Sequence, residues 1–184
     1  MTAEKRRQIY RVQVALDNLP DNLYAQKSFQ VAQRLIRLPE FARATYVAVF
    51  VGFGGEVDTV RLMEAALRLG KRVAAPVTDI AHRRLLWREI TDPNGQIALG
   101  SLGLPEPVST CKAADTSAFD LISVPGTVWD EKGRRLSLWP GYFDRSLKQH
   151  PHTFKVGLAF DLQVVGDLSQ WVDETLVDAL LTED

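Results

Sequence analysis

The sequence of 184 residues has one cysteine, Cys111, so no disulfide can form within the chain. It has no apolar run near the roughly 20 residues that a membrane-spanning helix needs; the longest, Tyr46 to Phe53, has the length of a strand. Neither sign of charge is in excess, since 22 Lys and Arg oppose 23 Asp and Glu. Nucleic-acid binding needs clustered excess cation. These absences predict a cytoplasmic protein that binds neither membranes nor nucleic acid.

The composition and the spacing of apolar residues predict one globular domain over residues 1–184 that contains several amphipathic helices. Hydrophobic residues make up 46% of the chain and charged residues 24%, which is typical of globular proteins. Helical spacing predicts helices over residues 4–19, 23–36 and 59–69. The apolar stripes that we expect to be buried are Ile9, Val12, Ala15 and Leu16 in the first helix, and Phe29, Ala32, Leu35 and Ile36 in the second.

Uncharged runs over residues 46–51 and 120–124 predict strands that are buried on both faces, as in a parallel sheet covered by helices. Further strands are expected over 73–75, 84–90 (at an edge) and 155–160, a helix over 141–149, and a strand or helix over 174–181. Residues 41–43 read as a turn, and 102–107 and 125–145 as loops. The fold class is therefore α/β, a single-domain three-layer sandwich with a mainly parallel central sheet flanked by helices.

Two segments that follow predicted strands are candidates for a site, because ligands of open α/β sheets bind beyond the carboxyl ends of the strands. The first, 52–58, holds Glu56 beside three glycines. Glu56 either orients a ligand or is a surface charge at a helix start. The second, 125–145, is long enough to be functional, or it is a covering flap anchored by Trp129 and Trp139. The residues alone leave both alternatives open.

A series of short motifs runs in order along the chain. They are Glu56-Val57-Asp58-Thr59, Gly70-Lys71-Arg72-Val73, Glu106-Pro107, Val124-Pro125-Gly126, Arg135-Leu136 and Gly141-Tyr142-Phe143-Asp144-Arg145. Gly157-Leu158-Ala159-Phe160 and Thr182-Glu183 continue the series. In this order the motifs resemble those of the 5-formyltetrahydrofolate cyclo-ligases, also called methenyltetrahydrofolate synthetases, over nearly the whole chain.

The resemblance implies an ATP-dependent ring closure that turns 5-formyltetrahydrofolate into 5,10-methenyltetrahydrofolate. In this family the formyl oxygen receives the γ-phosphate of ATP, N10 attacks the resulting iminium phosphate, and phosphate leaves. The implied cofactors are ATP and Mg²⁺, and the implied partners are a small folate substrate and a nucleotide. We expect a monomer or a weak homodimer.

The resemblance also assigns roles to residues. It implies that Val51, Glu56 and Tyr142 bind the folate, and that Arg135, Gly141 and Tyr142 are catalytic. The implied ATP-binding residues are Arg7, Arg11, Arg134, Arg135, Gly141, Tyr142 and Phe143. The implied metal ligands are Asp144 with Glu174 or Asp173. We accordingly expect a pocket between residues 52–56 and 135–144.

One stretch departs from the family pattern. Where the family has Gly-x-Gly-Lys-Gly, this chain has Ser137-Leu138-Trp139-Pro140-Gly141, so two glycines and a lysine that face phosphate are replaced. Pro140 cannot donate an amide hydrogen bond. The alternative to an active cyclo-ligase is therefore a relative that binds folate or another ligand with weak or no ATP-dependent turnover. A nucleic-acid-binding or protein-binding module is a third possibility, which the neutral charge disfavours.

Overall fold

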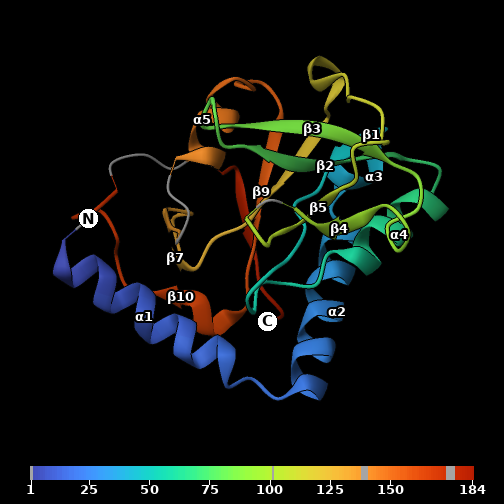
Figure 1. Cartoon of the computed structure of the whole chain (residues 1–184). Coiled ribbons are helices and arrows are strands. Elements are labelled where there is room, and N and C mark those ends of the chain that lie inside the picture. The colour runs from blue at the N-terminus through green and yellow to red at the C-terminus, as the bar shows by residue number, and fades with distance from the viewer. Residues whose placement is uncertain (1, 101, 138–140, 173–176) are drawn as a thin grey trace.

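The centre of the protein is a six-stranded sheet with the strand order β11-β9-β6-β1-β2-β3 (Figure 1). The computed structural model describes residues 2–100, 102–137, 141–172 and 177–184. The strands are β1 (Tyr46–Ala48), β2 (Arg72–Asp79), β3 (Arg84–Ile90), β6 (Leu121–Val124), β9 (Phe154–Leu158) and β11 (Ala179–Leu181). Neighbouring strands pair in parallel, except that β2 and β3 form an antiparallel hairpin. The predicted mainly parallel sheet is confirmed, with 84–90 at its edge.

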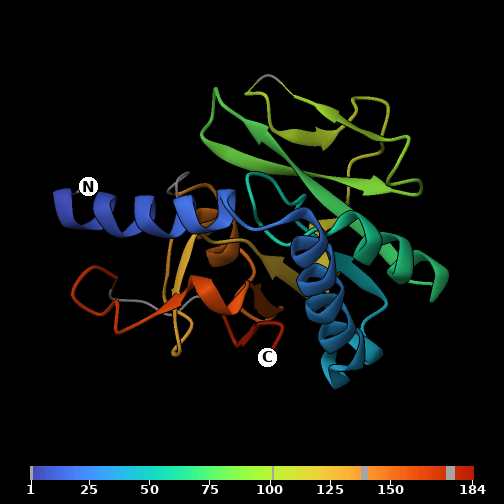
Figure 2. The ribbon, with the colours of Figure 1, turned by 90° about the horizontal axis from the view of Figure 1, so that it is seen from below.

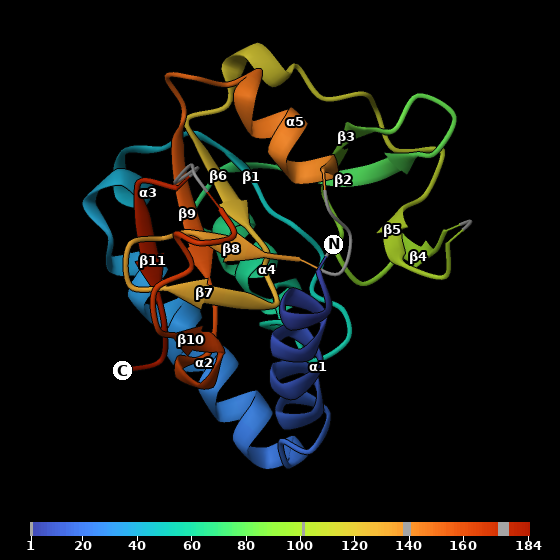
Figure 3. The same cartoon turned by 90° about the vertical axis from the view of Figure 1, so that its left-hand side faces the viewer.

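Helices cover both faces of this sheet. Those of the first face are α1 (Ala3–Asp17), α2 (Asp21–Arg37), α3 (Pro39–Arg43) and α4 (Val60–Arg68). On the other face lies α5 (Tyr142–Lys148), and Figure 3 shows α5 and α2 on opposite sides of the central strands. Side chains of β1 alternate accordingly, because Val47 packs in the core of the first face and Tyr46 and Ala48 in that of the second. The three-layer α/β prediction is therefore confirmed.

Two small sheets occupy segments that the sequence predicts as loops. Residues 102–107 contain β5 (Pro105–Pro107), which pairs with β4 (Ile97–Leu99) beside the β2–β3 hairpin (Figure 2). The long segment after β6 contains β7 (Val128–Asp130) and β8 (Arg135–Leu136), and β7 also pairs with β10 (Val164–Val165). The loop predictions were wrong here because strands of two or three residues are too short to show a repeating pattern.

Other boundaries and faces also differ from the sequence prediction. Phe29 is 56% exposed, and Ser28 instead takes a buried place on α2, where its Oγ accepts a hydrogen bond from Asp58 N. Ala15 is exposed as well. The strand predicted over 46–51 ends at Ala48, because Phe50 N donates to the Ser123 hydroxyl rather than to a neighbouring strand. The turn predicted over 41–43 belongs to helix α3.

Two short 3-10 helices, Thr116–Ala118 and Asp161–Gln163, complete the secondary structure. None of the helices in the described part of the chain is long and apolar enough to cross a membrane.

Candidate functional site

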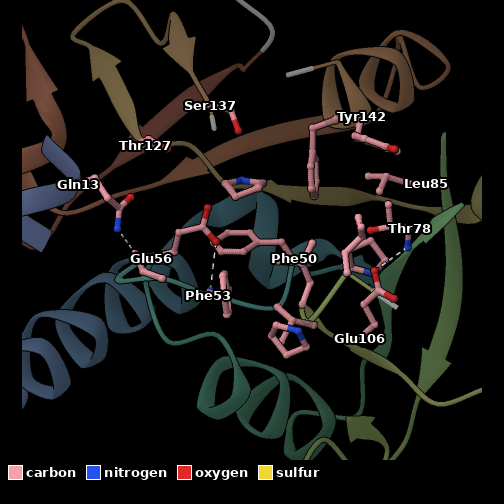
Figure 4. A pocket seen from close by; sticks show the side chains of 18 of the residues that line it. Gln13, Phe50, Phe53, Glu56, Thr78, Leu85, Glu106, Thr127, Ser137 and Tyr142 are labelled. Carbon is pink, nitrogen blue, oxygen red and sulfur yellow. Dashed lines mark hydrogen bonds between the residues drawn. The ribbon is translucent and has the colours of Figure 1, made fainter. Parts of the chain in front are cut away.

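A cavity of about 360 Å³ opens where β1, β2 and β6 end at their carboxyl edges (Figure 4). Its walls come from α1, from the segments after β1 and β6, from β2, β3, β5 and from the start of α5. The lining residues are Gln13, Leu16, Phe50, Val51, Phe53, Gly54, Glu56, Pro76, Thr78, Leu85, Leu102, Leu104, Pro105, Glu106, Pro125, Thr127, Ser137, Tyr142 and Phe143. Phe53, Gly54 and Glu56 thus line one cavity together with Ser137, Tyr142 and Phe143, at the place where the sequence predicts a pocket.

The segment 52–56 is held in place by a tight turn and by contacts with two helices. Gly54 and Gly55 both have positive φ, and a Cβ on Gly55 would lie 2.8 Å from the Cβ of Leu16. Only glycine fits so close to α1 in that conformation. Gln13 Nε2 donates to Gly54 O (2.7 Å), and the Tyr24 hydroxyl donates to the main-chain oxygen of Glu56 (2.9 Å). These contacts fix the backbone from which the Glu56 side chain enters the cavity.

The Glu56 carboxyl is largely withdrawn from water. Burial raises its pKa to about 7, although the hydrogen bond from Phe53 N and the nearby Arg135 guanidinium both favour the charged form. The Phe53 N–H is the one hydrogen bond to this carboxylate among the described residues (3.2 Å). A carboxyl with this pKa changes charge near neutral pH and retains capacity to accept hydrogen bonds from a ligand.

Arg135 is the cation of the site. It lies on β8 and is 7% exposed; its Nη1 donates to Pro125 O (3.0 Å) and its Nη2 to Asp144 Oδ1 (2.9 Å). Its Nε is buried and has no hydrogen-bond partner within the described residues. Burial lowers the pKa of Arg135, and the charges of Asp144 and Glu56 oppose that shift. Arg135 therefore interacts with both Glu56 and Asp144, the acidic residues of the two segments that the sequence predicts to border the pocket.

Asp144 is fully engaged in this arrangement. One carboxylate oxygen accepts from Arg135, and the other accepts from Gly141 N (2.8 Å), which closes the first turn of α5. Within the ranges that the structure describes, no group of three His, Cys, Asp or Glu residues could hold a metal ion. The predicted partners Asp173 and Glu174 lie outside the described residues. In this conformation, both oxygens of Asp144 are therefore occupied by donors of the protein.

The other predicted site residues divide into two groups. Val51, Tyr142 and Phe143 line the cavity together with Glu56. Arg135 and Gly141 are not part of the cavity lining. Three further arginines are also absent from it, and two of them, Arg7 and Arg11, are exposed on α1, which reaches the cavity through Gln13 and Leu16.

The third, Arg134, pairs with Asp130 (3.2 Å) and Asp167 (3.3 Å). Arg134 thus lies next to Arg135 in the chain but binds different partners, because successive side chains of an extended segment point in opposite directions.

Several lining residues carry no role in the sequence prediction, and two polar ones among them, Glu106 and Thr78, contact each other. Glu106 Oε1 accepts a hydrogen bond from Thr78 N (2.8 Å). Thr78 could have been found, because β2 continues past Pro76 toward the same edge of the sheet as β1. Glu106 belongs to a motif of the family, but its segment reads as a loop, so nothing in the sequence places it against β2.

Comparisons with known proteins agree with each other. A sequence model described as the 5-formyltetrahydrofolate cyclo-ligase family matches residues 2–183. A protein named 5-formyltetrahydrofolate cyclo-ligase from Escherichia coli (strain K12) is 36% identical over 143 residues, which cover 76% of this chain and 78% of the relative. A protein of the same name from Haemophilus influenzae is 29% identical over 192 residues, covering 98% and 100%. The NMR structure of Aquifex aeolicus 5,10-methenyltetrahydrofolate synthetase is similar with a TM-score of 0.83 and 30% identity, covering 98% of this chain and 90% of that one.

Proposed function

The chain belongs to the 5-formyltetrahydrofolate cyclo-ligase family, and from this premise we propose that it converts 5-formyltetrahydrofolate and ATP into 5,10-methenyltetrahydrofolate, ADP and phosphate. The observation that supports the proposal best is the cavity at the strand ends, which has Glu56 in its wall and the buried Arg135 beside it. A flat, partly apolar substrate with N–H donors and an anionic co-substrate suits a site of this kind.

The reaction needs two kinds of help from the protein. In the first step the formyl oxygen attacks the γ-phosphorus of ATP, the bond to ADP breaks, and an iminium phosphate forms at N5. N10 then attacks the iminium carbon and loses its proton, and the carbon–oxygen bond breaks to release phosphate. The protein must therefore hold the formyl oxygen near the γ-phosphate and balance the negative charge of the phosphates.

The folate role falls to Val51, Glu56 and Tyr142, which lie on the cavity wall with Phe143. Glu56 accepts hydrogen bonds from N–H groups of the folate, and the rings of Tyr142 and Phe143 give the substrate apolar surface. These contacts would fix the folate while its formyl oxygen points toward Arg135 and the start of α5.

The phosphate role falls first to Arg135. The Nε of its buried guanidinium has no partner among the described residues, and the guanidinium already binds one anionic group, so it is suited to pair with a phosphoryl oxygen. Gly141, at the N-cap of α5, belongs to the same segment. Three other arginines remain proposed ATP contacts: Arg7, Arg11 and Arg134. None of them lines the cavity, so they can contact only a part of the nucleotide that extends beyond it.

Magnesium binding by Asp144 with Asp173 or Glu174 also remains part of the proposal. Asp144 could offer an oxygen to a metal only after releasing Arg135 or Gly141 N. A monomer or weak homodimer in the cytoplasm completes the proposal, and light scattering after size exclusion tests the oligomeric state.

Absorbance of the methenyl product tests the function. The purified protein is mixed with 5-formyltetrahydrofolate, ATP and Mg²⁺, and we expect the methenyl chromophore to appear only with all components present. Folate binding without turnover would favour the alternative, a relative with a non-productive phosphate segment. The double variant Trp139→Gly with Pro140→Lys, which restores one glycine and the lysine of the family pattern, should then lower the Kd for ATP. An unchanged Kd would contradict the argument about this segment.

A further inference from the structure

Glu106 lies in the middle of β5 and is, with Glu56, one of two acidic side chains that line the cavity (Figure 4). It pairs in register with Ala98 of β4 and is 7% exposed. Its side chain reaches β2, where Oε1 accepts a hydrogen bond from Thr78 N (2.8 Å). The carboxylate is therefore fixed by two strands rather than by a mobile surface contact.

This carboxylate lacks the partners that a buried charge normally has. Within the described parts of the chain, no Lys, Arg or His nitrogen lies within 4.0 Å of it, and no donor binds Oε2. Gly100 packs directly on this oxygen, since a Cβ there would lie 2.2 Å from Oε2. A carboxylate that is largely shielded from water and has one hydrogen bond among the described residues retains capacity to accept further donors from a ligand.

The wall around Glu106 indicates which donors fit. Leu85, Leu102, Leu104 and Pro76 line the same cavity and present apolar surface. A flat ring with N–H groups along one edge would bury its faces on this surface and direct its edge to the carboxylate. The charge of Glu106 repels phosphate and the carboxylates of the glutamate part of a folate. Those groups must lie elsewhere, and Arg135 provides a cation for the phosphates.

We propose that Glu106 determines the specificity for folate by accepting hydrogen bonds from the 2-amino group and N3–H of the pterin ring. These two donors are adjacent and parallel, which matches the two oxygens of a carboxylate. Oε2 has no donor among the described residues, and Oε1 has a second lone pair beside its bond to Thr78 N. The inference rests on the proposed function, because it names the part of the folate that this site recognises.

The test combines a variant with a modified ligand. Glu106→Gln keeps the size of the side chain but turns an amide N–H₂ toward the pterin donors. We expect the KM or Kd for 5-formyltetrahydrofolate to rise at least tenfold, as for the loss of a charge-assisted hydrogen bond, and the KM for ATP to stay within about twofold. A folate analogue with methyl in place of the 2-amino group should bind the unchanged protein at least tenfold more weakly than its parent, and Glu106→Gln should lose most of that discrimination.

A purely structural role for Glu106 would give a different result. In that case the variant would bind folate and the 2-methyl analogue more weakly by the same factor, which would overturn the inference. Glu131→Gln, the same change at an exposed position outside the cavity lining, should alter neither ligand. If Glu106→Gln does not fold, Gly100→Ala serves instead, because its methyl group displaces Oε2 and should reduce the discrimination.

Failure of this inference is distinguishable from failure of the proposed function. Absence of the methenyl product with the unchanged protein would contradict the function, and direct titration of 5-formyltetrahydrofolate would still measure the role of Glu106. If the unchanged protein and Glu106→Gln bound 5-formyltetrahydrofolate with the same affinity, and also bound the 2-methyl analogue with the same affinity, the role of Glu106 would be contradicted. This result would hold whether or not the protein turns over its substrate.

Discussion

Replacing Glu56 by Gln should make the stability of the protein less dependent on pH. Burial raises the pKa of Glu56 from 4.5 to about 7 in the folded protein, whereas the unfolded chain keeps the ordinary value. The stabilising contribution of the protonated carboxyl is thus fully present below the unfolded pKa. It is lost as the pH rises through the folded pKa. At about 1.36 kcal/mol per pKa unit, the loss approaches about 3 kcal/mol.

Thermal unfolding at about pH 5 and pH 8 measures this effect. Gln is a neutral analogue of the protonated side chain and can still accept from Phe53 N, so the variant and the unchanged protein should be similarly stable at the lower pH. At the higher pH the variant should be more stable by roughly 2–3 kcal/mol, or about 4–12 °C in Tm for a protein of this size. Glu131→Gln is the matched exposed control.

The same carboxyl should couple folate binding to a proton. N–H donors of the substrate stabilise the charged form of Glu56, so affinity for 5-formyltetrahydrofolate should increase as the pH rises from about 6 to 8, and Glu56→Gln should abolish the increase.

The unfolding experiment can also refute the reasoning. If the Tm difference between Glu56→Gln and the unchanged protein were the same at about pH 5 and pH 8, Glu56 would not be a carboxyl with a raised pKa, and the electrostatic argument for the site would be refuted.

Three further changes test the surroundings of the site. Arg135→Lys keeps the charge but cannot donate to both Pro125 O and Asp144 as the guanidinium does. The KM for ATP should therefore rise roughly tenfold in steady-state assays. An unchanged KM would exclude a contact between Arg135 and phosphate. Tyr24→Phe removes the hydrogen bond to the main-chain oxygen of Glu56 and should lower the free energy of unfolding in urea by about 1 kcal/mol. An unchanged free energy would show that water replaces the tyrosine hydroxyl as the donor. Gly141→Ala places a side chain at φ +93° and should lower the free energy of unfolding by about 1–3 kcal/mol in urea. An unchanged free energy of unfolding would contradict this prediction.

Much of the fold could be predicted because its signals are local. The run 46–51 is apolar on both faces, as a central parallel strand requires, and Met63 and Ala66 repeat at the spacing of a helix that covers it. Glycines between strand and helix identified the turn at Gly54 and Gly55. Phe29 misled the prediction, because an apolar side chain in a helical repeat gives no sign that the neighbouring Ser28 binds Asp58 N.

The family, the parallel sheet and the two segments that border the cavity could be predicted from the amino acids alone, because each depends on the order and spacing of residues along the chain. The charged side chains that meet at the cavity could be identified only in the folded protein. Packing of β5 beside β2 brings Glu106 to Thr78, and Arg135 of β8 meets Asp144 at the start of α5, while Arg7 and Arg11 lie on the exposed side of their helix. The direction of a side chain depends on strand register and helix rotation, and both are set by packing between segments distant in the chain.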